Sequence, residues 1–533
     1  MKKYRALLFL LTLIVLITSV VLSGCGDNTV TAQKPTSAPQ STTNQPTQSG
    51  DTLASLYPQV DITKPVTIYS YQLGAAPKDL DKVVTEINKI LEPETNTSIK
   101  INFIDWGDIS TKYSLILAAG EDVDLVFTAP WNYYYQEAAK GAFMEITDDF
   151  LTKAMPKTKE TQVQEAWDSV KINGKIYGVP KNVMTPEHKF VAIREDLREK
   201  HNIPALTDWT SYENFLVTIA EKETPVSGIF GIAASINNNE LTRIWMQQYG
   251  IFDGENAQIG PFAYLYNGGA LPKEEDFFVL WDSQYMREFA KRMRYLAEKG
   301  CWSQDALSGT VTDDDAFANG QGASIAWNGT VYTYGKLCEK NIPGAVAGYY
   351  DLTPDSIVHA ENYSNCIMAI ASASKYPDRA GMVLDLLKNH TPLYRLYVGG
   401  IENEHYIVTE DGLRDKGPAA DDYPWDNCGW GIRRDDLLGV ANEDPRESTL
   451  NATFVPRMVV PPTNGFVFDQ VPVKNEMAAV QAIIDEYRPI LELGMVEDVD
   501  KTIDEMMNSM NRSGLDIVKT EFLNQYKAWL SSR

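Results

Sequence analysis

The sequence predicts an α/β protein with two doubly wound lobes and a helical C-terminal region. The first foldable stretch alternates strand and helix patterns, and helical patterns fill the end of the chain. The part of the chain that can fold, about 475 residues, is too long for one hydrophobic core, so two lobes are expected.

The first lobe is predicted from six alternating elements. β-Branched and aromatic residues mark strands, and apolar residues at three- and four-residue steps mark helices. The predicted strands are residues 66–71, 99–104 and 124–128, and the predicted helices are residues 80–91, 113–119 and 133–140. A β-α-β-α-β order builds a parallel, doubly wound sheet.

The carboxyl ends of these strands form the first candidate site. In open α/β sheets, ligands bind beyond the carboxyl ends of the strands. Each of the three ends carries an aromatic residue beside a side chain that can hydrogen-bond. The candidate ligand-binding residues there are Tyr71, Gln72, Trp106, Trp131, Asn132 and Tyr133.

The middle of the chain contains further elements. Residues 172–177 resemble a hairpin, and Thr210 with Glu213 has the spacing of a capping box at a helix start. Residues 284–299 form a predicted helix that ends at Gly300. Residues 323–329 read as a strand and turn, which places Trp327 and Asn328 as a candidate ligand-facing pair.

The end of the chain turns helical. Apolar residues at helical spacing predict helices around residues 480–487, 499–510 and 517–530. We interpret the methionines of these helices as core residues, because the flexible thioether fills irregular gaps.

The N-terminus has the pattern of an export signal. Lys2, Lys3 and Arg5 precede an apolar run at residues 6–22, and the run ends in Leu-Ser-Gly-Cys at residues 22–25. The run could also just span a bilayer, but its ending matches a lipobox. We therefore predict a lipoprotein signal peptide at residues 1–24 and lipidation of Cys25. Residues 25–56 are polar and predict a disordered tether to the membrane.

The charge and the cysteines exclude several functions. The net charge is −24, and removal of the three basic residues of the signal leaves −27, which argues against nucleic acid as a partner. Cys301, Cys338, Cys366 and Cys428 are widely spaced, so we predict buried thiols, no metal and no cofactor.

Several motifs, in this order, resemble family 1 extracellular solute-binding proteins, and most closely their LipO-type lipoproteins. Besides the lipobox and the strand that leads to Trp131, they are Ala-Ala-Lys-Gly-Ala-Phe at residues 138–143, Asn-Gly-Lys-Ile-Tyr-Gly-Val-Pro at 173–180, Phe-Ala-Asn-Gly at 317–320, Gly-Gly-Ile-Glu-Asn-Glu-His-Tyr at 399–406, Gly-Phe-Val-Phe-Asp at 465–469 and Val-Lys-Asn-Glu at 473–476. In the motif at residues 399–406, Asn403 replaces the glycine that is usual after the first Glu. The likeness covers nearly the whole mature chain.

The resemblance implies a periplasmic-binding-protein-like fold, in which two lobes joined by a hinge enclose the ligand. We place lobe 1 at residues 57–181 and about 366–425, and lobe 2 at residues 182–365 and about 440–533. The chain would cross between the lobes near residues 181–183 and 362–366.

The resemblance also implies ligand residues and partners. Trp131 and Asn132 match sugar-contacting positions that are charged in maltose-binding relatives, Asn182 falls near an acidic cleft position, and Trp327 falls near a stacking aromatic. Asn464, beside the C-terminal motif, completes the predicted set. The expected protein is a monomer, lipid-anchored on the extracytoplasmic face of the cell membrane, that passes an oligosaccharide to the membrane subunits of an ABC permease.

Two alternatives remain open. The same fold could bind a peptide or an anionic sugar, with Lys181, Arg194 or Arg243 as the cations. A secreted glycosidase would need two carboxylates about 5–10 Å apart. Asp105, Glu402 and Glu404 are available for this chemistry, but no recognisable constellation joins two of them, so we expect no enzymatic activity.

Overall fold

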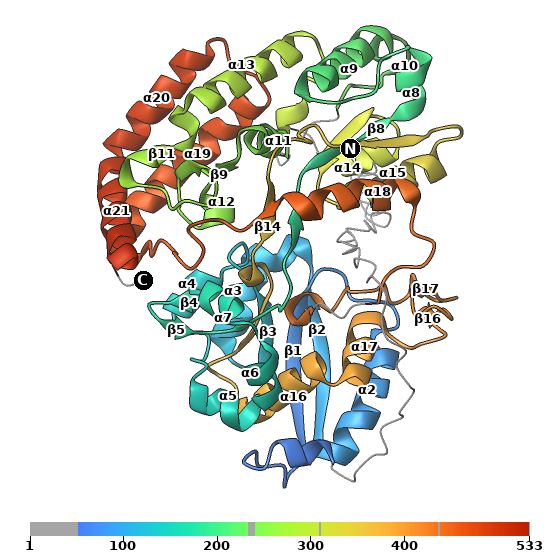
Figure 1. Cartoon of the computed structure of the whole chain (residues 1–533), viewed down its shortest axis with the longest axis vertical. Helices are drawn as coiled ribbons and strands as arrows, with labels where there is room; N and C mark the ends of the chain where they lie inside the picture. Colours follow the sequence, from blue (N-terminus) through green and yellow to red (C-terminus); the bar gives the residue numbers. More distant parts are fainter. Residues whose placement is uncertain (1–51, 233–239, 309–310, 435–437, 532) are drawn as a thin grey trace, which may run out of the picture.

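The computed structural model describes residues 52–232, 240–308, 311–434, 438–531 and 533. In Figure 1 the strands β1, β2 and β3 lie in the lower half of the molecule, and the helices α13, α19, α20 and α21 lie in the upper half. Each half has its own buried core, one built from residues 57–179 and 366–432 and the other built mainly from residues 191–526. We call these the lower and the upper body.

The lower body is built on a five-stranded sheet in the order β2-β1-β3-β15-β6. Its strands are β1 (Val66–Leu73), β2 (Thr97–Ile104), β3 (Leu125–Thr128), β15 (Ile367–Ile370) and β6 (Val179–Pro180). Strands β2, β1 and β3 run parallel, as predicted, whereas β15 is antiparallel to both β3 and β6. The chain therefore returns to this sheet after it has built most of the upper body.

Helices cover the sheet of the lower body, and short elements complete it. The helices are α2 (Leu80–Thr95), α3 (Ile109–Ala119), α4 (Tyr134–Ala139), α5 (Asp148–Ala154), α6 (Pro156–Thr161), α7 (Gln164–Ser169), α16 (Pro377–Asn389) and α17 (Thr391–Gly399). The hairpins are β4 (Lys171–Ile172) with β5 (Lys175–Ile176), as predicted, and β16 (Tyr406–Val408) with β17 (Arg414–Lys416).

The sheets of the upper body are small. Their strands are β7 (Thr185–Glu187), β8 (Phe190–Arg194), β9 (Ile251–Phe252), β10 (Phe262–Leu265), β11 (Phe278–Val279), β12 (Ser324–Trp327), β13 (Ala347–Tyr350), β14 (Val358–Glu361) and β18 (Met458–Val459). In the sheet β12-β8-β13 both pairs are antiparallel, so this sheet is not the parallel one that double winding predicts.

Helices make up most of the upper body. They are α8 (Glu195–Lys200), α9 (Trp209–Lys222), α10 (Thr224–Ser227), α11 (Glu240–Tyr249), α12 (Gly254–Ala257), α13 (Gln284–Glu298), α14 (Asp313–Ala318), α15 (Thr330–Asn341), α18 (Pro445–Phe454), α19 (Lys474–Glu492), α20 (Val499–Arg512) and α21 (Leu515–Ser531). The three C-terminal helices were all predicted. The two α/β bodies with a helical C-terminal region confirm the expected fold class, while the lobe boundaries stay a prediction.

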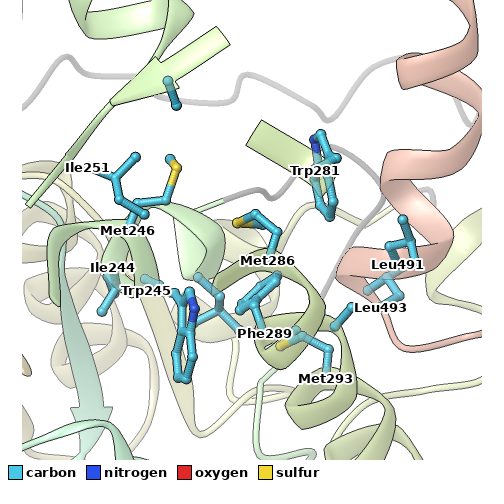
Figure 2. Close-up of a cluster of buried hydrophobic side chains, with 14 of the residues drawn as sticks. Ile244, Trp245, Met246, Ile251, Trp281, Met286, Phe289, Met293, Leu491 and Leu493 are labelled. Carbon is cyan, nitrogen blue, oxygen red and sulfur yellow. The ribbon is translucent and has the colours of Figure 1, made fainter. Parts of the chain in front are cut away.

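The C-terminal helices share the hydrophobic core of the upper body. Figure 2 shows Leu491 and Leu493 beside Met286, Phe289 and Met293 of the α13 segment, with residues of α11 and β9 in the same cluster. The indole N–H of Trp302 also donates to the carbonyl of Leu493 at 3.1 Å. The last part of the chain is therefore an integral wall of this body.

The start of α9 corrects a sequence prediction. The side chain of Asp208 accepts a hydrogen bond from the Ser211 N–H at 2.8 Å, and the Ser211 hydroxyl accepts one from the Asp208 N–H at 3.0 Å. The capping box is therefore Asp208 with Ser211, and the predicted pair Thr210 with Glu213 is wrong. Asp208 prevails because its carboxylate reaches the unpaired N–H groups of the first turn.

Two further expectations concern the cysteines and the membrane. Cys301, Cys338, Cys366 and Cys428 are buried free thiols, as predicted. No helix in the described part of the chain is long and apolar enough to cross a membrane. The predicted signal peptide, Cys25 and nearly all of the predicted tether lie outside the described residues.

A buried ion pair joins two of the segments that connect the bodies. The Lys181 ammonium, fully buried after β6, pairs with the Glu361 carboxylate at the end of β14. The same carboxylate accepts hydrogen bonds from the Thr185 hydroxyl at 2.7 Å and from the Asn365 amide. The Lys181 N–H donates to the Cys366 carbonyl at 2.9 Å. These contacts, here called the hinge network, hold the two connections side by side.

The first prediction concerns the helix cap. Asp208→Ala should lower the free energy of unfolding by about 1 kcal/mol, because it leaves a helix N–H without its acceptor. The change is measured by urea denaturation. Thr210→Ala is the control, since Thr210 is exposed and caps nothing. A larger loss from the Thr210 variant would contradict the observed capping box.

The second prediction concerns the hinge network. Glu361→Gln leaves the Lys181 ammonium buried without a counter-charge, which should cost about 3–5 kcal/mol in the free energy of unfolding. Glu404→Gln is the matched control, because its pair with Lys82 is partly exposed and should contribute at most about 1 kcal/mol.

The pH dependence of stability tests the same pair. Burial favours a raised pKa for Glu361, but the charges of Lys181 and Arg433 outweigh burial and hold the pKa well below its usual value. The stabilisation is therefore present above the ordinary pKa of 4.5 and is lost as the pH falls below it. The Glu361→Gln variant should lack this loss, and an unchanged acid limb of the stability curve would refute the assignment.

Candidate functional site

Three tryptophans gather at the carboxyl edge of the lower sheet. Trp106 follows β2 and Trp131 follows β3, and their ring centroids lie 6.4 Å apart. Trp430, in a short helix at Trp430–Ile432, stacks on Trp106 with centroids 5.7 Å apart and planes 26° apart. Trp106 and Trp131 remain 37% and 46% exposed, while Trp430 is buried beneath them. We call the three rings the tryptophan platform.

The sequence predicted two of the three platform rings. Trp430 was missed because it lies about 300 residues further along the chain than Trp131 and follows no predicted strand. Gly74 provides room for the platform at the end of β1. Its φ of +97° is left-handed, and a Cβ atom there would lie 3.0 Å from the Trp106 indole nitrogen.

The other predicted residues of this edge mostly make contacts inside the lower body. The Gln72 amide is buried and donates to the Tyr397 hydroxyl at 2.7 Å, so it is directed into the core and away from any ligand. Asn132 is also buried, and its Oδ1 has no hydrogen-bond partner among the described residues. Tyr71 and Tyr133 are half-buried, and the Tyr133 ring lies 5.9 Å from that of Tyr113.

The predicted residues of the upper body and the connections are dispersed. Trp327 packs against a small core cluster, and the described residues show no ring contact between it and the platform. The Asn328 side-chain oxygen Oδ1 caps its own turn by accepting from the N–H and the hydroxyl of Thr330. The Asn182 side chain bonds to the backbone of residues 161 and 163, and Asn464 accepts from the Asn362 amide at 2.8 Å.

A cleft of about 1870 Å³ lies between the two bodies. Its lower wall is formed by α4 and the hairpin β4–β5, including Tyr135, Asn173 and Tyr177. Its upper wall is formed by α11, the turn around Gln258, and the chain from Asn464 onward. In Figure 1, α4, β4 and β5 lie across from α12 and the end of α21. Of the ten predicted ligand residues, only Asn464 lines this cleft.

The cleft combines aromatic rings with amides and internally paired charges. Arg243 pairs with Asp253 at 2.6 Å, and Glu492 accepts from the Thr242 hydroxyl at 2.9 Å. Burial raises the pKa of Glu492 to about 7. The Tyr135 hydroxyl is buried without a hydrogen-bond partner among the described residues. Such a lining offers stacking surface and directed hydrogen bonds with little net charge.

The hinge network reaches the platform. The Trp131 indole N–H donates to the Asn365 carbonyl at 3.0 Å, and the Asn365 amide donates to Glu361. A ring at the sheet edge is thus two hydrogen bonds away from the buried ion pair.

One group of side chains could be considered for a metal. Ligand atoms of Asp79, Glu404 and His405 lie within 4.8 Å of one another. However, Lys82 already pairs with Glu404, and the His405 Nδ1 accepts from the Ile401 N–H at 2.8 Å. His405 Nε2 lies 3.3 Å from Asp79 Oδ2. The cluster therefore works as a tie between α2 and the loop after α17.

Comparisons with known proteins agree with this geometry. Residues 82–343 match the family model of bacterial extracellular solute-binding proteins, and residues 462–531 match a domain of unknown function, DUF3502. A carbohydrate ABC transporter substrate-binding protein of Streptococcus pneumoniae serotype 4 (strain ATCC BAA-334 / TIGR4) is 24% identical over 480 residues, which cover 88% of this chain and 92% of the relative.

Solved structures share the fold. The N-glycan transport solute binding protein NgtS of Streptococcus pneumoniae superposes with a TM-score of 0.67 at 21% identity, covering 87% of this chain and 99% of that chain. The alginate-binding protein AlgQ2 gives a TM-score of 0.64 at 15% identity, covering 88% and 100%. Residues 82–343 therefore belong to the family of bacterial extracellular solute-binding proteins, and the solved structures show that the fold of the chain is shared.

Proposed function

We propose that this protein captures an extracellular oligosaccharide in the cleft between its two bodies and delivers it to an ABC permease. The observation that carries the proposal is the cleft itself. Its volume of about 1870 Å³ exceeds the roughly 300–1,000 Å³ of pockets for ordinary small molecules. A ligand of several sugar units fits that space better than a single nutrient molecule does.

The chemistry of the lining supports a sugar. A pyranose has an apolar face that packs on aromatic rings, and hydroxyl groups that need paired donors and acceptors. The cleft offers Tyr135, Tyr177 and Trp529 together with the amides of Asn173 and Gln481. The related pneumococcal protein is named for carbohydrate, and NgtS structures hold Man1GlcNAc and Man5GlcNAc.

The cations predicted for an anionic ligand are already paired with carboxylates of the protein. Arg194 pairs with Asp196, Arg243 with Asp253, and Lys181 with Glu361. A charge that is already paired gains little from an anionic ligand. The glycosidase alternative is weakened in a similar way, since Glu404 is paired with Lys82.

We further propose that the protein is a monomeric lipoprotein of the LipO type on the extracytoplasmic face of the membrane. The support is the Leu-Ser-Gly-Cys ending of the N-terminal apolar run. Two acyl chains on the diacylglycerol of Cys25 would give a stable anchor where one chain would not.

The third prediction tests ligand capture. Titration calorimetry of the purified protein with Man1GlcNAc, Man5GlcNAc, kestose and cycloalternan should show one-to-one binding of at least one glycan. Tyr177→Ala should weaken that binding more than tenfold, because it removes an aromatic ring that lines the cleft. Tyr295→Ala, an exposed aromatic on α13, is the control. Normal affinity of the Tyr177 variant would remove this wall of the cleft from the binding site, and failure of all four glycans would count against the function.

The fourth prediction tests the anchor. Cys25→Ser should abolish incorporation of radiolabelled palmitate and release the protein from the membrane fraction, because the serine hydroxyl cannot form the thioether. Cys301→Ser should leave labelling unchanged, since that thiol is buried. Palmitate labelling that persists in the Cys25 variant would contradict the assignment.

A further inference from the structure

The C-terminal segment, which matches a domain of unknown function, forms much of the upper wall of the cleft. Half of the residues that line the cleft belong to the chain from Asn464 to Arg533. They come from the loop before α19, from one face of α19, and from the last turns of α21. A segment with no assigned role therefore faces the space in which we propose that the ligand lies.

One stripe of α19 runs along this wall. Lys474, Gln481 and Arg488 all line the cleft and follow one another at seven-residue steps. Seven residues are nearly two helical turns, so at 1.5 Å per residue the α-carbons are about 10.5 Å apart along the axis, and the stripe spans about 21 Å. Met477 and Ile484 lie between these positions and are buried. These two apolar side chains also line the cleft, between the polar ones.

The stripe carries hydrogen-bonding capacity that the protein does not use. The Arg488 Nε is buried without a hydrogen-bond partner among the described residues. Arg488 forms a long ion pair with Glu492, in which the Nε and Oε2 atoms lie 4.0 Å apart, and burial raises the pKa of Glu492 to about 7. A buried donor without an acceptor is unfavourable, so an acceptor from a ligand is favoured there. Gln481 donates to exposed Asp485, one turn along the helix, and to no other residue that the structure describes.

The wall is held rigidly on the upper body. The Asp469 N–H donates to the Gln525 amide oxygen at 2.9 Å, and the Gln525 amide donates back to the Asp469 carbonyl at 2.8 Å. The Tyr526 hydroxyl donates to the Pro272 carbonyl at 2.6 Å. Because these bonds fix the loop at Asp469 against α21, and α21 against the chain at Pro272, little ordering of this part of the wall is left for the moment of binding.

We infer that residues 462–531 are the wall that selects the length of the ligand, and that an extended oligosaccharide lies with its long axis along the Lys474–Gln481–Arg488 stripe. This inference rests on the proposed function and deepens it. A glycan that spans the stripe reaches donors at both ends, whereas a disaccharide covers only part of it. The C-terminal segment therefore favours longer glycans over shorter ones.

The fifth prediction compares Man5GlcNAc with Man1GlcNAc. The double variant Gln481→Ala with Arg488→Gln should bind Man5GlcNAc at least tenfold more weakly than the unaltered protein does, and Man1GlcNAc less than threefold more weakly. The matched control is Glu486→Ala with Arg512→Ala, which alters exposed positions of α19 and α20 that do not line the cleft. Titration calorimetry gives both affinities.

A second variant distinguishes a loss of binding from a loss of folding. Gln481→Ala alone changes an exposed side chain and should keep the thermal midpoint of the unaltered protein while still weakening Man5GlcNAc more than Man1GlcNAc. Equal affinities of variant and unaltered protein, or equal weakening for both glycans, would overturn the length-selecting wall alone. Failure of the unaltered protein to bind either glycan would overturn the wall together with the proposed function for these ligands.

Discussion

The pair between Lys181 and Glu361 is the constraint on which the arrangement of the two bodies depends. The lysine is fully buried, and a buried ammonium without a counter-charge is unfavourable by several kcal/mol. The pair therefore fixes how the connection after β6 lies against the connection before β15. Since Thr185 and Asn365 also donate to the same carboxylate, four side chains from two distant stretches of sequence are held at one point.

The second constraint is the way in which the chain is shared between the bodies. Strand β15 returns to the lower sheet beside β3, and Leu491 and Leu493 complete the core around α13. Neither body is a continuous stretch of sequence, so each needs distant segments before its core is closed. This explains why the C-terminal helices, which carry few features of a binding site in sequence, end up as a wall of the cleft.

Much of the fold could be predicted from local patterns, and much of the site could not. The strands β1 to β3, the hairpin β4–β5 and the helices α19 to α21 follow periodicity, which is a local property. The exposed rings Trp106 and Trp131 were also predicted from the sequence. The predictions failed where a residue distant in sequence determines the contact. The Gln72 amide donates a hydrogen bond to Tyr397, and Trp430, far along the chain, belongs to the platform.

The hinge network also limits how the bodies can move against each other. Breaking the ion pair would be more unfavourable than the gain from a typical hydrogen bond. Any movement that brings the two bodies together must therefore keep Lys181 beside Glu361, so the backbone dihedral angles on either side of the pair must change instead. Trp131 is bonded to the carbonyl of Asn365, whose amide donates to Glu361. A displacement of this ring therefore changes a contact of a residue that belongs to the network itself. Because the platform and the connection share Asn365, the position of the Trp131 ring and the relative position of the bodies are physically linked.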